Sequence, residues 1–148
     1  MAQSHEVCRP TPAAVPGSIF RGMTDTTRPS GDTIRRRVLG DAYVDRVAQS
    51  GDPFLAPFFE AGIEHVWGGL WNRPGLDLKY RSLVVISTLA ATGRLHELRT
   101  HLRGGLNLGW TADELREALL QTAGYAGFPA AVETLRVLSD TLRDSTNP

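Results

Sequence analysis

The segment between Asp77 and Gly93 constrains the fold most, because it is apolar on nearly every side. Its sequence, LKYRSLVVISTLAAT, leaves little polar surface, so we expect a helix that forms the central and most buried element. Asp77 can cap the start of this helix, and Gly93 suits a left-handed cap after its end. The inner stretch SLVVIS has strand-like β-branching, but a fifteen-residue run between a cap and a glycine favours a helix.

Helical periodicity continues on both sides of this segment. A helix is predicted from Thr33 to the sequence QSGDP near residue 50. A second helix is predicted to end at WGGLW, with one face made of Phe58, Phe59, Ile63, Val66 and Leu70. A third covers residues 94–106, a capping box of Thr111 and Glu114 opens a fourth, and Pro129 lies in the first turn of the last. No segment favours a strand, so the predicted fold class is all-α.

Length and composition indicate one domain rather than two. The chain has 148 residues, of which 41% are hydrophobic, and this is enough for one substantial core. Residues 33–144 are expected to form a single helical domain. Residues 1–32 are rich in proline, threonine and serine and show no apolar period, so they are expected to form a mobile N-terminal extension.

Charge and cysteine content narrow the possible partners. Sixteen basic residues balance sixteen acidic ones, so no net charge attracts nucleic acid. The single cysteine, Cys8, allows neither an internal disulfide nor a redox thiol pair nor a cysteine-based zinc site. No stretch has the roughly 18 apolar residues of a membrane span, and the N-terminus lacks a secretory pattern. We therefore expect a soluble, cytoplasmic protein that binds neither nucleic acid nor a membrane.

The segment GRLHELRTHLRGGLNLG, residues 93–109, concentrates polar side chains on a helix that also carries a core stripe. Glu97 and His101 are four residues apart and lie on one flank of that stripe, with His96 on the opposite flank and Thr100 between them. A carboxylate beside an imidazole at the edge of an apolar face can move protons near neutral pH. Such a pair is also common as a solvated surface contact, so a purely structural role stays open.

Gly104 and Gly105 follow His101 and remove side chains beside it. They leave room either for a ligand or for close packing of another helix. No metal site is expected, because one well-placed histidine and one glutamate fall short of three protein ligands and the chain lacks an H-E-x-x-H motif.

The sequence WGGLWNRPGLDLKYRS forms a second cluster of interest. Trp67 and Trp71 are one helical turn apart, and Arg73 and Arg81 follow within ten residues. Cations set against aromatic walls can bind a carboxylate, because a guanidinium donates two parallel hydrogen bonds to it. The alternative, in which the tryptophans are core and the arginines are solvated, stays open. The RRR run at residues 35–37 is interpreted as the solvated start of a helix.

The chain resembles the carboxymuconolactone decarboxylase family over about residues 34–142. The similarity is carried by RRRVLGDAYVDR, WNRPGLDLKYRSLVVISTLAATGR, ELRTHLRGGLNLGWTADELREALLQTA and YAGFPAA. The resemblance implies an alkylhydroperoxidase D-like subunit of about six helices that assembles into a ring-like homo-oligomer, a trimer or a hexamer. It also implies cofactor-free decarboxylation of 4-carboxymuconolactone to an enol-lactone in aromatic catabolism.

The resemblance extends to single residues. His101 matches the family histidine. Positions where the decarboxylase branch carries similar residues are Glu97, Arg73, Arg81 and Tyr125. The redox branch has two cysteines seven and four residues before the histidine, where this chain has Arg94 and Glu97, so a peroxidase reaction has no thiol nucleophile.

Three positions depart from the decarboxylase branch. Tyr43, Gly69 and Val132 stand where that branch tends to have a histidine, a glutamate and an asparagine. These changes alter the proton-carrying and hydrogen-bonding groups of the expected pocket. They indicate a relative adapted to another lactone or to a secondary-metabolite acid.

The leading hypothesis is a cofactor-independent lyase that acts on a small carboxylated ring compound. Arg73 or Arg81 would hold a carboxylate, the tryptophans would exclude water, and His101 with Glu97 would deliver a proton to the carbon that loses CO₂. One alternative keeps the fold but is a cyclase or isomerase, or a decarboxylase of a secondary-metabolite intermediate. Another is a non-catalytic ligand-binding or assembly subunit in which the Glu97–His101 pair is structural.

Overall fold

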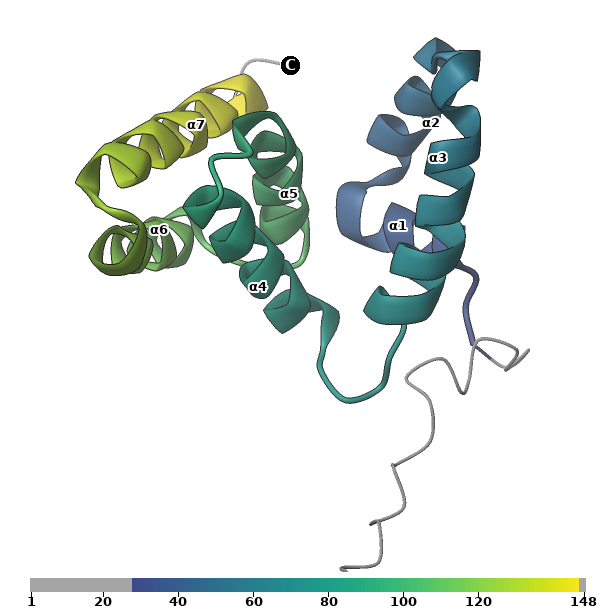
Figure 1. Cartoon of the computed structure of the whole chain (residues 1–148), viewed down its shortest axis with the longest axis horizontal. Helices are drawn as coiled ribbons and strands as arrows, with labels where there is room; N and C mark the ends of the chain where they lie inside the picture. Colours follow the sequence, from purple (N-terminus) through teal and green to yellow (C-terminus); the bar gives the residue numbers. More distant parts are fainter. Residues whose placement is uncertain (1–27, 147–148) are drawn as a thin grey trace, which may run out of the picture.

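The computed structural model describes residues 28–146, and every regular element among them is a helix (Figure 1). In chain order these are α1 (Gly31–Leu39), α2 (Asp41–Ser50), the 3₁₀-helix η1 (Pro53–Leu55), α3 (Ala56–Ala61), the π-helix η2 (Gly62–Trp71), α4 (Leu78–Ala91), α5 (Leu95–Asn107), α6 (Ala112–Ala126) and α7 (Phe128–Thr146). The predicted all-α class is confirmed. The described residues form seven α-helices, slightly more than the expected six.

The helices form two groups that meet where α1 packs on α5. Figure 1 shows α1, α2, α3 and η2 on one side and α4 to α7 on the other, joined by residues 72–77. The first group is centred on a buried cluster of Ile34, Val38, Leu39, Val44 and Trp71. The second is centred on a larger cluster that includes Ile86, Leu98, Leu102, Leu115 and Leu119. The interior of the molecule is therefore divided between two apolar clusters.

Two adjacent glycines of α5 permit close packing, Gly104 against the other helix group and Gly105 within its own group. A Cβ on Gly104 would lie 3.2 Å from atoms of Val38 and Leu39 on α1, and a Cβ on Gly105 would lie 3.0 Å from Ile86 on α4. Of the two roles expected for these glycines, the structure supports close helix packing rather than space for a ligand.

The prediction of one helix from Thr33 to residue 50 is wrong, because Gly40 divides it into α1 and α2. Gly40 has φ +86°, in the left-handed region that favours glycine. Its N–H donates to the carbonyl of Arg36 at 2.8 Å and so closes α1. The predicted end near residue 50 is confirmed at Ser50, and the break at Gly40 adds the extra helix.

The segment expected to be one helix ending at WGGLW is instead α3 followed by η2. A π-helix has wider turns than an α-helix, is rare, and occurs frequently at functional sites. The apolar stripe of this segment is largely exposed, with Phe58 74% and Leu70 56% exposed. Trp71 is the buried residue of η2 and joins it to the cluster around α1.

The predicted ends of α4 and α6 are confirmed with one exception. The SLVVIS stretch lies within α4, which begins after Asp77, although the Asp77 side chain makes no capping hydrogen bond. Gly93 follows α4 with φ +68°. Thr111 and Glu114 form the capping box: the Thr111 N–H donates to Glu114 Oε2 at 2.8 Å, and the Glu114 N–H donates to Thr111 Oγ1 at 3.1 Å.

A network of ion pairs fixes α5 against α7. Arg99 contacts Asp140 at 3.5 Å and Asp144 at 3.1 Å, and Arg103 contacts Asp144 at 2.9 Å. Each partly exposed pair contributes at most about 1 kcal/mol, but the shared carboxylate links both arginines to one point on α7. The network therefore adds to the burial of Leu98 and Leu102, which sets the face that α5 turns toward the core.

Most of the predicted N-terminal extension, residues 1–27, lies outside the described residues, as do residues 147–148. The end of that segment begins α1, where the Ser30 hydroxyl accepts a hydrogen bond from the Thr33 N–H at 3.1 Å. Among residues 28–146, none of the helices has the length and apolar character needed to cross a lipid bilayer.

Gly31 lies where the start of α1 meets the backbone of η2. A Cβ at this position would lie 2.0 Å from the carbonyl oxygen of Ile63 and 2.8 Å from the amide nitrogen of Gly68. Gly31→Ala should therefore lower the free energy of unfolding by about 2 kcal/mol or more, measured by urea denaturation. Gly62→Ala is the control, because a Cβ there meets nothing within 4 Å and should be neutral or stabilise by about 0.5–1 kcal/mol. Equal stability of the two variants would contradict this packing.

Candidate active site

A cavity of about 480 Å³ lies between the two helix groups. Residues of α1, α2, α3 and η2 line one side, and residues of α4 and α5 line the other. Its polar lining residues are Arg35, Tyr43, His96, Glu97, Thr100 and His101, and its other walls are apolar and aromatic. A concave apolar site with a few converging polar groups is typical of small-molecule binding.

His101 packs between α5 and the two tryptophans of η2. Its ring centroid lies 6.2 Å from that of Trp67 and 6.0 Å from that of Trp71, with interplanar angles of 14° and 15°. The two indoles stack on each other at 4.8 Å. Trp67, Trp71 and His101 thus form one aromatic cluster, although the histidine is about thirty residues from the tryptophans in the sequence.

Burial sets the protonation state of His101. Loss of solvent around the ring lowers the pKa of His101 to about 4, so the imidazole is neutral at pH 7. A neutral imidazole carries one N–H donor and one acceptor nitrogen. Nδ1 is buried and has no hydrogen-bond partner among the described residues. Such an unpaired buried polar atom is rare in folded proteins.

Glu97 lines the same cavity as His101 but is exposed to solvent. No hydrogen bond or ion pair joins the two side chains within residues 28–146, so the predicted pair shares a cavity without direct contact. Glu97 therefore occupies the solvent side of the site, whereas His101 occupies its interior.

Two hydroxyl groups meet at the cavity wall. Tyr43 Oη on α2 lies 3.2 Å from Thr100 Oγ1 on α5, and the guanidinium of Arg46 lies 5.7 Å from the centre of the Tyr43 ring. Sequence reasoning identified Tyr43 only as a departure from the family pattern and gave Thr100 no function. Their proximity depends on how α2 packs, for which the sequence contains no local signal.

Arg35 is a second residue whose place in the cavity was missed. The solvated helix start predicted for the RRR run fits Arg36, which pairs with Asp32, Asp41 and Asp45. Arg35 instead lines the cavity. One signal was available, since Arg35 and the buried Leu39 are four residues apart and so share a helix face.

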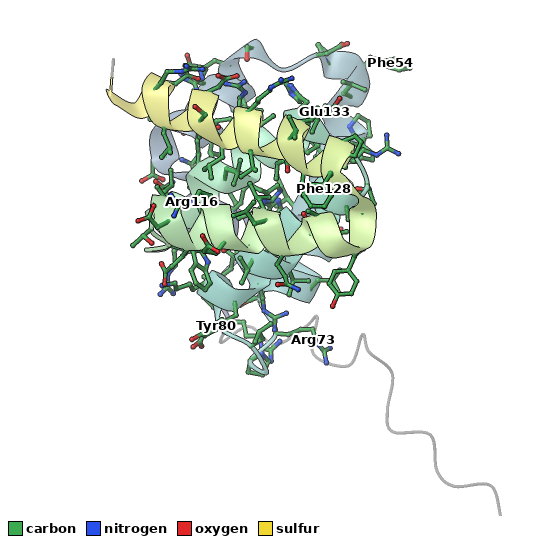
Figure 2. All side chains as sticks on the ribbon, turned by 90° about the vertical axis from the view of Figure 1, so that its left-hand side faces the viewer. Phe54, Arg73, Tyr80, Arg116, Phe128 and Glu133 are labelled. Carbon is green, nitrogen blue, oxygen red and sulfur yellow. The ribbon has the colours of Figure 1, made fainter. Side chains whose placement is uncertain are left out.

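The other predicted substrate-binding residues lie away from His101. Arg73 lines a separate hollow of about 390 Å³ beside the 72–77 turn, with Trp71 as a shared wall, and Figure 2 shows it at the opposite end of the molecule from Phe54. Arg81 donates to the carbonyls of Leu76 at 2.9 Å and Arg73 at 2.7 Å, and so holds this turn together.

Tyr125 is also remote from the cavity. Its side chain is 86% exposed and lines an apolar groove between α4 and α6. The chain therefore brings His101, Glu97, Trp67 and Trp71 together, but not the two arginines or Tyr125. Within the described part of the chain, no group of three or more His, Cys, Asp or Glu side chains is arranged to hold a metal ion.

Comparison with known proteins identifies the family. A family model described as the carboxymuconolactone decarboxylase family matches residues 56–140. The chain belongs to this family. It is 39% identical over 123 residues to the 4-carboxymuconolactone decarboxylase of Acinetobacter baylyi. This alignment covers 82% of this chain and 92% of that protein. It is 40% identical over 114 residues to a nitrosuccinic acid decarboxylase of Metarhizium robertsii, and that alignment covers 77% of this chain and 80% of that protein.

A third relative is an uncharacterized 15.0 kDa protein of Paracoccus denitrificans, 35% identical over 86 residues, or 56% of this chain and 64% of that protein. The two decarboxylase relatives and the family match identify this chain as a carboxy-lyase of the carboxymuconolactone decarboxylase type. The matched residues 56–140 include His101 and both tryptophans of the cavity. Arg35 and Tyr43 precede them, so α1 and α2 complete the site from outside the matched region.

The stability of this carboxymuconolactone decarboxylase relative should depend on pH through His101. Between pH 6.5 and 4 the unfolded chain binds a proton at this histidine and the folded chain does not. The stabilisation that comes from keeping His101 neutral is therefore fully present above pH 6.5. The free energy of unfolding falls by up to about 3 kcal/mol as the pH is lowered toward 4. Urea unfolding at several pH values should show that His101→Gln loses this part of the slope.

His65→Gln is the control, because His65 is exposed on η2 and does not line the cavity. It should keep the pH dependence of the wild type. Parallel curves for the wild type and His101→Gln would contradict a buried neutral imidazole.

Proposed function

We propose that this decarboxylase acts on a small carboxylated lactone such as 4-carboxymuconolactone, or on a similar acid, and that His101 protonates the carbon that loses CO₂. The observation that carries the proposal is a neutral, mostly buried imidazole stacked on two tryptophans at the wall of a recessed cavity. The names of the two decarboxylase relatives, which refer to 4-carboxymuconolactone and nitrosuccinic acid, support this substrate class.

Decarboxylation breaks the bond between a carbon atom and its carboxylate and leaves the electron pair on that carbon. In a conjugated lactone the pair spreads into the carbonyl group, and a proton then forms the new C–H bond. One carboxylate and one proton thus give CO₂ and the product. A site that excludes water favours this step, because the charge of the reactant carboxylate is localised and that of the transition state is dispersed.

His101 is suited to supply this proton once substrate is bound. The negative charge of an acid in the cavity would raise the pKa of the imidazole toward neutrality, so His101 would take up a proton as the substrate enters. Trp67 and Trp71 cover the ring and keep bulk water from the carbanion. Glu97 is the proposed relay that returns a proton from solvent to His101 through a bridging water, because the two side chains have no direct hydrogen bond.

The sequence-based prediction that Arg73, Arg81 and Tyr125 bind substrate draws no support from their positions in one subunit. Arg81 is engaged in holding the turn before α4, and Tyr125 lies beside a different groove. We therefore assign these three residues no contact with a substrate beside His101 of the same chain.

His101→Gln should lower kcat by about 10²- to 10⁴-fold, because it removes the proton donor but keeps a polar side chain of similar size. The assay measures CO₂ released from 4-carboxymuconolactone and, separately, from nitrosuccinate. His65→Gln should keep wild-type turnover, and circular dichroism verifies that both variants are folded.

Three outcomes would overturn parts of this proposal. Unchanged turnover by His101→Gln would remove His101 from the mechanism. A product formed without CO₂ would favour the isomerase or cyclase alternative. Failure of the wild type to convert either acid would overturn the proposed substrate class.

We also propose that the subunits associate with one another in a homo-oligomer. Large apolar side chains are exposed on two separate surfaces. The surface on η1, α3 and η2 contains Phe54, Phe58, Phe59, Val66 and Leu70, and the surface on α4, α6 and α7 contains Tyr80, Val84, Leu120, Tyr125, Phe128 and Val132. Figure 2 labels Phe54, Tyr80 and Phe128 among them. Contact between two different surfaces is head-to-tail and can close into a ring, which fits a trimer or a hexamer.

Light scattering after size-exclusion chromatography should therefore give a mass three or six times the 16.1 kDa of one chain. Phe128→Ser, which removes a 77%-exposed ring, should shift the protein toward smaller species. Glu133→Ser changes an exposed polar residue on the same helix and should not. A wild-type mass of 16.1 kDa at tens of micromolar would contradict self-association.

A further inference from the structure

Arg35 has a position that the proposed proton transfer does not use. Among the described residues that line the cavity, it alone carries a permanent positive charge. It is half-buried on α1, in the helix group opposite the α5 helix that carries His101. The two residues thus contribute different chemistry from opposite sides of one cavity.

The neighbouring arginines of the RRR run differ from Arg35 in their surroundings. Arg36 contacts Asp32 at 2.8 Å, Asp45 at 2.7 Å and Asp41 at 3.3 Å, so its charge is balanced within the protein. Arg37 is exposed and borders the hollow beside the 72–77 turn. Arg35 has no side-chain hydrogen bond or ion pair with any of residues 28–146, so its guanidinium donors are available to a ligand.

Protein carboxylates do not occupy this guanidinium. Glu97 lines the same cavity, and Asp52 and Glu60 line an adjoining hollow of about 300 Å³ that also contains Arg35. None of these carboxylates lies within ion-pair distance of Arg35. A partly buried arginine without an internal partner is a site for an external anion, and a guanidinium binds a carboxylate through two parallel hydrogen bonds.

The substrate class adds a requirement that Arg35 can satisfy. 4-Carboxymuconolactone and nitrosuccinic acid each contain two carboxyl groups, and loss of CO₂ consumes only one of them. A cation paired with the departing carboxylate would stabilise the reactant more than the transition state, in which that charge is dispersed. A cation paired with the retained carboxylate stabilises both equally and fixes the orientation of the substrate.

We propose that Arg35 binds the carboxylate that the substrate keeps, and so orients the other carboxylate toward the aromatic wall and His101. This inference rests on the proposed function for the identity of the substrate, but the binding of a carboxylate by Arg35 does not depend on turnover. Arg35 is on this basis the residue that makes the site select diacids over monoacids.

The test is a binding measurement with a probe that does not decarboxylate. The saturated γ-lactone acid 5-oxotetrahydrofuran-2-acetate has no conjugation and carries only the side-chain carboxylate that 4-carboxymuconolactone keeps, and its carboxamide is about the same size without the charge. Quenching of tryptophan fluorescence reports occupation, because Trp67 and Trp71 line the cavity, whereas Trp110 does not and adds a constant background. The wild type should bind the carboxylate at least tenfold more tightly than the amide.

Arg35→Gln should weaken binding of the carboxylate by about 10- to 100-fold and leave binding of the amide unchanged. Arg35→Lys should recover part of the affinity, because it keeps the charge without the two-pronged geometry. Arg37→Gln is the matched control from the same helix and should bind like the wild type.

Equal affinity of the wild type and Arg35→Gln for the carboxylate would overturn the proposal, and so would equal loss for the carboxylate and the amide, which would indicate a general effect on the cavity. If Arg35→Gln loses only the carboxylate while His101→Gln retains full turnover, the inference stands and the proposed proton transfer fails. The two hypotheses can therefore be tested independently.

Discussion

The packing of the His101 ring against Trp67 and Trp71 is the contact on which the rest of the site depends. The histidine comes from one helix group and the tryptophans from the other, so the same stack connects the groups and forms a wall of the cavity. Burial in this stack removes water from the imidazole and keeps it neutral. The pKa of an imidazole that is neutral in the empty site rises when the negative charge of an acid is placed beside it.

Several unusual backbone features hold this stack in place. The π-helix η2 presents Trp67 and Trp71 on one side, and Gly31 lets α1 approach its backbone more closely than any side chain would permit. Gly104 performs the same function where α5 meets α1. The site is thus positioned by contacts between main chains as much as by contacts between side chains.

The parts of the site that lie within one helix could be predicted from the sequence. The spacing of Leu98, His101 and Leu102 on α5 placed the histidine beside the core, and the fold class followed from apolar periodicity. The break at Gly40 could not be predicted because the apolar pattern continues across it. The π-helix η2 could not be predicted because its apolar residues have a spacing that also fits an α-helix. The sequence put Glu97 and His101 on one flank of α5 and His96 on the other, but the cavity is lined by all three and by Thr100.

The helices α1 and α2 supply Arg35, Leu39, Tyr43 and Val47 to the cavity, yet they precede the segment that matches the family model. If Arg35 and His101 act as proposed, recognition of the acid and delivery of the proton belong to separate stretches of the polypeptide. On that proposal, substitutions in residues 28–47 would change which acid is accepted while His101 remains intact. Members of one family can in this way differ in substrate specificity and keep the same reaction mechanism.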